Sequence, residues 1–179
     1  MKKSLLVMAM ICLVFTASNA QTSKGSWLVG GGISFSSSKT GDFKQTDFAF
    51  TPGAGYFFAN NFAAGATVGF ASSKEEGEDA ATLFSFNPFL RYYFVELGPK
   101  AKLFGNGSFG FGSAKISGES ESFTAWEISA GPAIFLNPHV ALEIAVAYGS
   151  TKFKDADDAT NTFGAKVGLQ IHLGPAAKK

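Results

Sequence analysis

The sequence predicts an all-β protein, an eight-stranded antiparallel up-and-down transmembrane β-barrel. The first observation is a period-two alternation on both sides of a short Asn-rich turn in residues 46–70, which is typical of a β-hairpin. One face of this hairpin is large and apolar and the other is nearly all small, as expected between lipid and a lumen. The last observation is that the same alternation recurs along the rest of the chain and gives eight strands in total. The large face comprises Phe48, Phe50, Pro52, Ala54, Tyr56, Phe62, Ala64, Ala66, Val68 and Phe70.

Residues 1–20 have the features of a cleaved secretory signal peptide. Two lysines precede an apolar centre at Leu5–Phe15, and residues 18–20 form a small-residue cleavage site. The alternative is a membrane anchor, but a spanning helix needs about 18 apolar residues, more than this segment provides. We therefore assign residues 21–179 to the barrel domain. That domain has no cysteine, because Cys12 lies in the signal peptide.

The charge of the chain excludes one class of partner. The sequence has 15 Lys and Arg against 14 Asp and Glu, and removing the two lysines of the signal peptide leaves 13 against 14, a net charge of −1. This balance offers no electrostatic basis for binding nucleic acid. No later stretch is long enough for a transmembrane helix, so a membrane-spanning chain must be a barrel.

The expected strands are joined by polar segments and tight turns in alternation. Each strand has about ten residues, the length that a tilted strand needs to cross a bilayer. The expected strands are residues 25–35, 46–58, 62–71, 84–94, 102–111, 126–136, 140–148 and 163–173. The expected polar loops are Ser37–Gln45, Ser72–Ala81, Ala114–Ser122 and Lys152–Asn161.

Three prolines occupy similar places, each a few residues before a tight turn. Proline removes a ladder hydrogen bond, so each is expected to mark a local bulge or bend. These residues are Pro52, Pro88 and Pro132.

The ionisable residues within the expected strands all fall on the small, lumen-facing side. A random register would not sort them in this way, and the sorting favours the barrel over a soluble sheet. These inward residues are Arg91, Lys102, Glu127, Glu143, Lys166 and His172.

The lumen charges predict a network centred on Glu143. This residue lies on the seventh expected strand, roughly diagonal to Lys166 on the eighth, and Arg91 on the fourth strand can reach it across the barrel. A charge in so narrow a lumen is partly desolvated and needs a partner of opposite sign. We therefore expect Glu143 to link Arg91 and Lys166.

Aromatic side chains are expected to close the lumen at its short-turn end. An eight-stranded barrel has room for its own side chains or one small ligand and for no wide channel. We expect a plug made of Phe57, Phe89, Tyr93, Phe104 and Phe135.

Three segments resemble the small outer-membrane β-barrel family of the OmpA/OmpX type, the "porin family". They are PGAGYFFANNFAAGATVGF (52–70), NPFLRYYF (87–94) and LFGNGSFGFG (103–112). The resemblance covers essentially the whole mature chain. It implies the outer membrane of a Gram-negative bacterium, with the short turns and both termini on the periplasmic side, and no enzyme activity.

The leading functional hypothesis is a non-enzymatic, monomeric outer-membrane protein that is structural or presents surface loops. The lipid of the outer membrane is its expected partner, with no nucleic acid and no cofactor. A narrow porin for small solutes is the alternative. A lipid-modifying enzyme ranks last, because the outward sets contain no His and no Ser and His172 faces the lumen. Asp155, Asp157 and Asp158 could hold a divalent cation, although they lack an EF-hand pattern.

Overall fold

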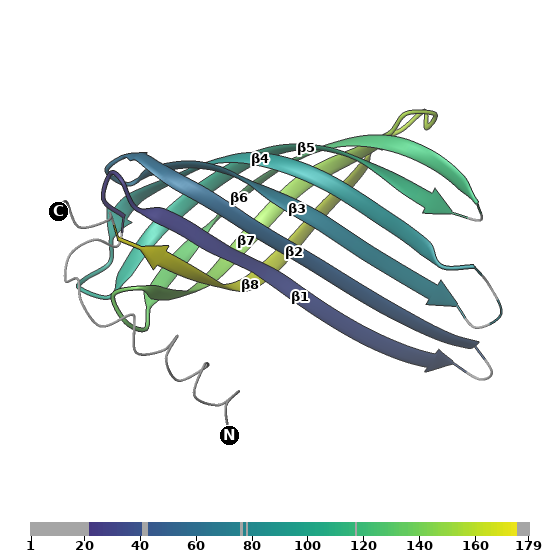
Figure 1. Cartoon of the computed structure of the whole chain (residues 1–179), viewed down its shortest axis with the longest axis horizontal. Helices are drawn as coiled ribbons and strands as arrows, with labels where there is room; N and C mark the ends of the chain where they lie inside the picture. Colours follow the sequence, from purple (N-terminus) through teal and green to yellow (C-terminus); the bar gives the residue numbers. More distant parts are fainter. Residues whose placement is uncertain (1–21, 41–42, 76, 78, 117, 175–179) are drawn as a thin grey trace, which may run out of the picture.

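The computed structural model describes residues 22–40, 43–75, 77, 79–116 and 118–174, and it confirms the predicted eight-stranded barrel (Figure 1). The predicted signal peptide lies outside the described residues. Each strand pairs antiparallel with the next, and β8 pairs with β1 to close the barrel. Within the described residues there is no helix long and apolar enough to cross a membrane. The strands are β1 (Trp27–Thr40), β2 (Phe43–Ala59), β3 (Phe62–Glu75), β4 (Ala81–Glu96), β5 (Ala101–Ile116), β6 (Glu119–Phe135), β7 (Val140–Phe153) and β8 (Thr160–Leu173).

The two faces of the wall are those that the alternation predicts. Trp27 is 50% exposed whereas its neighbour Leu28 is 2% exposed, and Phe58 is 45% exposed beside a fully buried Phe57. Because successive side chains of a strand point to opposite faces, these contrasts establish the register. The large residues therefore face outward and the small ones line the lumen.

Aromatic residues form two belts on the outer face. Near the short turns, Phe62 stacks on Tyr92 with ring centroids 4.4 Å apart. Near the other end, Trp126 meets Tyr148 with centroids 5.6 Å apart. On β3, Phe62 and Phe70 mark the two belts, and eight residues of tilted strand separate them by roughly 20 Å. Aromatic belts of this kind mark the two edges of the membrane.

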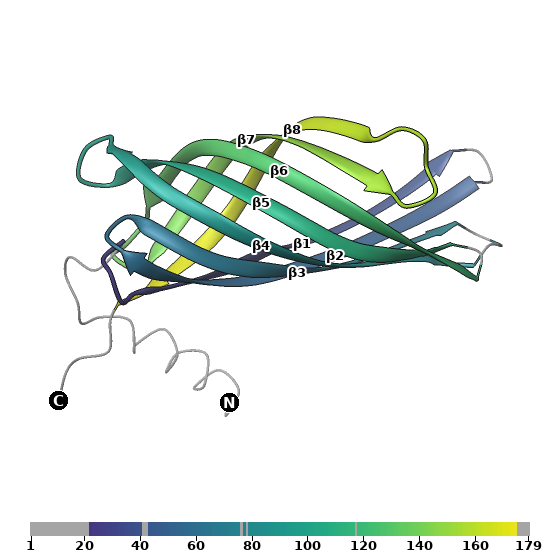
Figure 2. The same ribbon diagram turned by 90° about the horizontal axis from the view of Figure 1, so that it is seen from above.

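Two of the four expected polar loops, Ser37–Gln45 and Ala114–Ser122, are mostly strand, and this part of the prediction was wrong. The other two keep a connection, between Glu75 and Ala81 and between Phe153 and Thr160. The β1–β2 hairpin pairs as far as Thr40 with Phe43, and the β5–β6 hairpin as far as Ile116 with Glu119. Backbone hydrogen bonds continue the ladder regardless of side-chain polarity, so polar sequence beyond the membrane stays in strands. We call the end that these hairpins form the hairpin end, and the opposite end the turn end (Figure 2).

Each of the three prolines lies in a local break of the ladder, as predicted. Pairing of β2 with β3 skips from Phe50 to Gly53, and the register is the same on both sides of the break. The same occurs between β4 and β5 around Pro88 and between β6 and β7 around Pro132. The prolines therefore mark gaps in the ladder that leave the register unchanged. The register shifts lie elsewhere, close to the turn end, after Phe57 on β2 and after Tyr93 on β4.

The seam between β1 and β8 is much shorter than the other strand pairs. It runs from Trp27 opposite Leu173 to Gly31 opposite Leu169. Gly31 has φ +153°, and a Cβ there would approach the carbonyl oxygen of Thr51 to 2.5 Å, so this position suits glycine. Beyond Gly31, β1 runs away from β8 (Figure 1), and side chains along both edges, such as Ile33 and Phe163, are more than 70% exposed.

A charge on the lipid face should destabilise the barrel according to its depth. Val68→Arg on β3 places a charge between the aromatic belts, at a cost of about 2–4 kcal/mol. Ser72→Arg on the same face of the same strand lies beyond Phe70, where the cost falls to about 0–1 kcal/mol. Urea unfolding of the two variants in lipid vesicles measures both costs. Equal costs would contradict the placement of the membrane between the belts.

Candidate functional site

An ion pair spans the lumen between opposite walls. Arg91 on β4 and Glu143 on β7 point toward each other, and their Nη1 and Oε1 atoms are 2.7 Å apart. The two residues are 9% and 6% exposed. A buried charge is stable only when paired, so this contact is what allows both residues to lie in the wall. The predicted link between Arg91 and Glu143 is confirmed.

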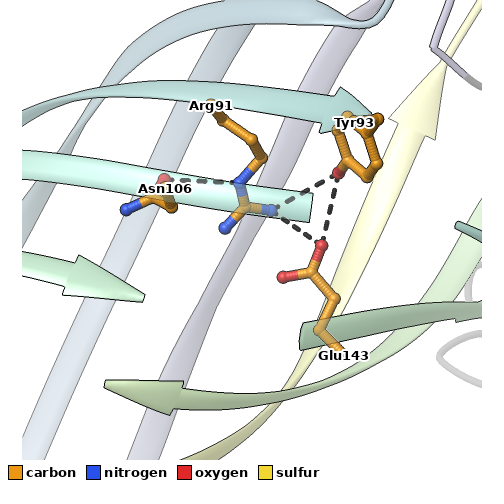
Figure 3. A network of polar contacts seen from close by, with 4 residues as sticks. All are labelled: Arg91, Tyr93, Asn106 and Glu143. Carbon is orange, nitrogen blue, oxygen red and sulfur yellow. Dashed lines mark hydrogen bonds and ion pairs between the residues drawn. The ribbon is translucent and has the colours of Figure 1, made fainter. Parts of the chain in front are cut away.

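Two further side chains complete the pair, and the sequence alone did not assign them to it (Figure 3). The hydroxyl of Tyr93 donates to Glu143 Oε1 at 3.3 Å and accepts from Arg91 Nη1 at 3.4 Å. Arg91 Nε donates to Asn106 Oδ1 at 3.3 Å. Tyr93 follows Arg91 by two residues and so lies on the same face of β4. Asn106 on β5 is the register partner of Arg91. The strand pairing would have identified both.

The guanidinium also lies over an aromatic ring. Arg91 Cζ is 4.4 Å from the ring centroid of Phe104 on β5. The face of an aromatic ring attracts a cation, and the attraction grows when water is excluded. The network therefore ties β4, β5 and β7 together across the lumen.

Lys166 does not join this network, and that part of the prediction was wrong. Its ammonium forms an ion pair with Glu127 on β6. In the β7–β8 ladder Lys166 lies opposite Ala145, whereas Gly168 lies opposite Glu143. Its long side chain runs toward the hairpin end, where the side chains of Lys166 and Glu127 are 56% and 30% exposed. Water there solvates the ammonium, and Arg91 already neutralises Glu143.

Below the ion pair, aromatic rings close the turn end of the lumen. We call this cluster the floor; its members are Phe57, Tyr93, Phe104, Phe135 and His172. Each of them is at most 3% exposed. The predicted plug is therefore confirmed for four of its five residues, while Phe89 is only partly buried and packs against the cluster. His172 takes the remaining place, with its ring centroid 5.1 Å from that of Phe135.

The segment before β1 seals the floor from outside. Gly25 N donates to Phe57 O at 2.8 Å, and Asn61 N donates to Thr22 O at 2.7 Å. The hydroxyl of Thr22 accepts from Lys102 Nζ at 3.0 Å. Thr22 and Ser26 are 4% and 0% exposed. Residues just after the predicted cleavage site are thus part of the closure, which no sequence pattern indicated.

The described residues offer little for catalysis or metal binding. The ring Nδ1 of His139 donates to the carbonyl oxygen of His172 at 3.0 Å, so this ring holds the β6–β7 turn against the end of β8. Within the described ranges, no three His, Cys, Asp or Glu side chains come together as metal ligands, and this includes the Asp155–Asp158 loop. The arrangement at the site can close a lumen and cross-link its walls.

A family model described as "Outer membrane protein beta-barrel domain" matches residues 5–170. The chain belongs to this family of bacterial outer-membrane proteins. No curated protein matches it.

Two solved structures show the same fold. The barrel is similar to the neisserial surface protein NspA, at 14% identity and TM-score 0.54, with 84% of this chain and 97% of that chain covered. It is also similar to the outer membrane protein OprG of Pseudomonas aeruginosa, at 13% identity and TM-score 0.52, with 87% of this chain and 100% of that chain covered.

Removing the acid of the buried pair should cost more stability than the pair itself contributes. Glu143→Gln leaves Arg91 charged and buried without a counter-ion, at a cost of about 3–5 kcal/mol. Arg91→Gln in the same background should recover part of this loss, with a coupling energy of roughly 1–3 kcal/mol in a double-mutant cycle. Urea unfolding of the refolded barrel provides all four stabilities.

Lys166 supplies the matched control for this cycle. Combining Lys166→Gln with Glu143→Gln should give additive losses, because the two side chains make no contact. Lys166→Gln with Glu127→Gln should show a coupling of about 0–1 kcal/mol, since that pair is exposed. A coupling of Glu143 with Lys166 as large as that with Arg91 would contradict the assignment of the network.

Proposed function

We propose that this protein is a non-enzymatic and non-conducting outer-membrane barrel, which is structural or presents its hairpin end to partners. The observation that carries this proposal is the closed floor. Rings from β2, β4, β5, β6 and β8 meet there, and Phe57 is fully buried. An eight-stranded barrel has room for its own side chains or one small ligand and for no wide channel. The Arg91–Glu143 pair spans the lumen directly above.

The floor also argues against the narrow-porin alternative. A solute entering at the hairpin end would have to displace the buried ion pair, then the aromatic rings, and then the segment around Thr22. Each of these layers is held by contacts between different strands. Passage would therefore require the wall itself to open.

The geometry gives no support for a lipid-modifying enzyme. Acyl or phosphoryl chemistry needs a nucleophile and a base within hydrogen-bonding reach of each other. Within the described residues, both histidines lie at the turn end: His172 is 1% exposed inside the floor, and the His139 ring is engaged by a backbone carbonyl. Neither faces the lipid.

Planar-bilayer recording tests the proposal. The refolded wild-type barrel should show no sustained single-channel steps. A variant with Phe57→Ala and Phe104→Ala removes two floor rings, and any conductance that it gains would locate the closure there. The matched control, Phe58→Ala with Phe109→Ala, removes two outward rings and should remain silent. Regular steps from the wild-type protein would favour the porin.

Surface presentation requires the hairpin end to face outward from the cell. Because the mature chain has no cysteine, single cysteines report the orientation without background labelling. Ala80→Cys and Asp157→Cys, at the hairpin end, should react with an impermeant thiol reagent on intact cells. Asn60→Cys and Pro138→Cys, at the turn end, should react only after lysis. The reverse pattern would overturn the proposed orientation.

A further inference from the structure

Charged residues between the belt of Trp126 and Tyr148 and the hairpin end are sorted by face: lysines and glutamates lie on opposite sides of the wall. On β3, Lys74 shares the outward face of Phe70, whereas Glu75 shares the inward face of Ala63. By the same alternation, Lys115 on β5 and Lys152 on β7 face outward, whereas Glu119 and Glu121 on β6 face inward. At the hairpin end of the described strands β3, β5, β6 and β7, lysines point outward and glutamates inward. The outward residues are Lys74, Lys115 and Lys152, with Lys154 just past the end of β7, and the inward ones are Glu75, Glu119 and Glu121.

Two of these lysines border a groove on the outer face. Its volume is about 570 Å³, and it crosses β4, β5, β6 and the end of β7. Two rows of side chains build it. One row runs Phe84, Ser113, Ser122 and Lys154, and the other runs Phe86, Phe111, Thr124 and Lys152.

The groove is hollow because its centre is made of small residues. Ser113, Ser122 and Thr124 lie between phenylalanine rings on one side and lysines on the other. A second hollow of about 190 Å³ continues past Thr124 toward Trp126, with Lys152 between the two. The surface thus combines aromatic rings, hydroxyl groups and two ammonium groups at the edge of the membrane.

Both ammonium groups are available to a ligand. Lys152 Nζ has only a 3.5 Å contact to the backbone oxygen of Asp157, and Lys154 is exposed. Among the described carboxylates, none forms an ion pair with either lysine, including the three aspartates of the β7–β8 loop. The lysine stems can lie along the wall while the charges stay at head-group height.

We propose that this groove binds the phosphate of an anionic membrane lipid. Lys152 and Lys154 neutralise the phosphate, the hydroxyls of Ser122 and Thr124 can donate to its oxygens, and the acyl chains lie against Phe86 and Phe111. Basic residues at membrane edges attract anionic head groups, and aromatic residues settle at the same depth. The inference rests on the membrane placement of the barrel and holds whether or not the lumen conducts. A lipid is favoured over free phosphate because the groove opens on the same face as the aromatic belt.

Native mass spectrometry of the barrel in detergent, titrated with phosphatidylglycerol, tests the proposal. The wild type should retain one lipid more tightly than Lys152→Ala with Lys154→Ala, by about 30-fold in Kd. Thr124→Trp fills the groove without changing charge and should also weaken retention. Heat-modifiable gel migration of each variant shows that it is folded.

The controls separate this site from general charge attraction. Lys74→Ala removes another outward lysine at the hairpin end, on β3, and it should change the Kd less than twofold, against about fivefold for Lys152→Ala. Lys24→Ala with Lys100→Ala removes two charges from the turn end and should have no effect. Equal losses from all lysine variants would overturn the site, as would displacement of the lipid by millimolar inorganic phosphate.

Discussion

A lipid bilayer offers no hydrogen-bond partner to a peptide group, so every strand in it must be paired. In this barrel the antiparallel ladder between consecutive strands meets that demand and continues past the membrane into polar hairpins. The prolines interrupt it only locally and without a change of register. At the β1–β8 seam the ladder ends at Gly31. There the unpaired edges border the open half of the lumen, where Lys166 and Glu127 are exposed to water.

The same closure fixes the width of the lumen and hence its contents. Small residues such as Ala63, Ala133 and Ala141 line the wall beside the floor, and this leaves room for aromatic rings from opposite strands to meet. A charge in that space must be matched across it, as Arg91 and Glu143 are. Toward the hairpin end the lumen is open enough for Lys166 to remain hydrated. The barrel is therefore closed at one end and polar at the other.

The outer face is also divided along the barrel axis. Among the side chains that the structure describes in the strands, this face is apolar between the aromatic belts, and its charges beyond the Trp126–Tyr148 belt are lysines. The inward positions at that height hold glutamates, which keeps negative charge away from the head groups. This asymmetry gives the wall a chemical match to anionic lipid. The match to anionic lipid is best at the groove, where small residues leave a hollow beside Lys152 and Lys154.

The sequence by itself determined the fold class, the strand count, the two faces and most of the floor. These features follow from period-two alternation, because one lipid-facing side must stay apolar along every strand. It also identified Arg91 and Glu143 as partners, since a narrow lumen forces opposite buried charges together. The ends of the strands could not be read in this way, because a polar hairpin and a polar loop have similar composition. Only the tertiary structure decided that Glu127 takes Lys166, that Tyr93 joins the ion pair and that Thr22 seals the floor. Those contacts depend on the stagger between strands and on side-chain reach across the lumen, which no local pattern encodes.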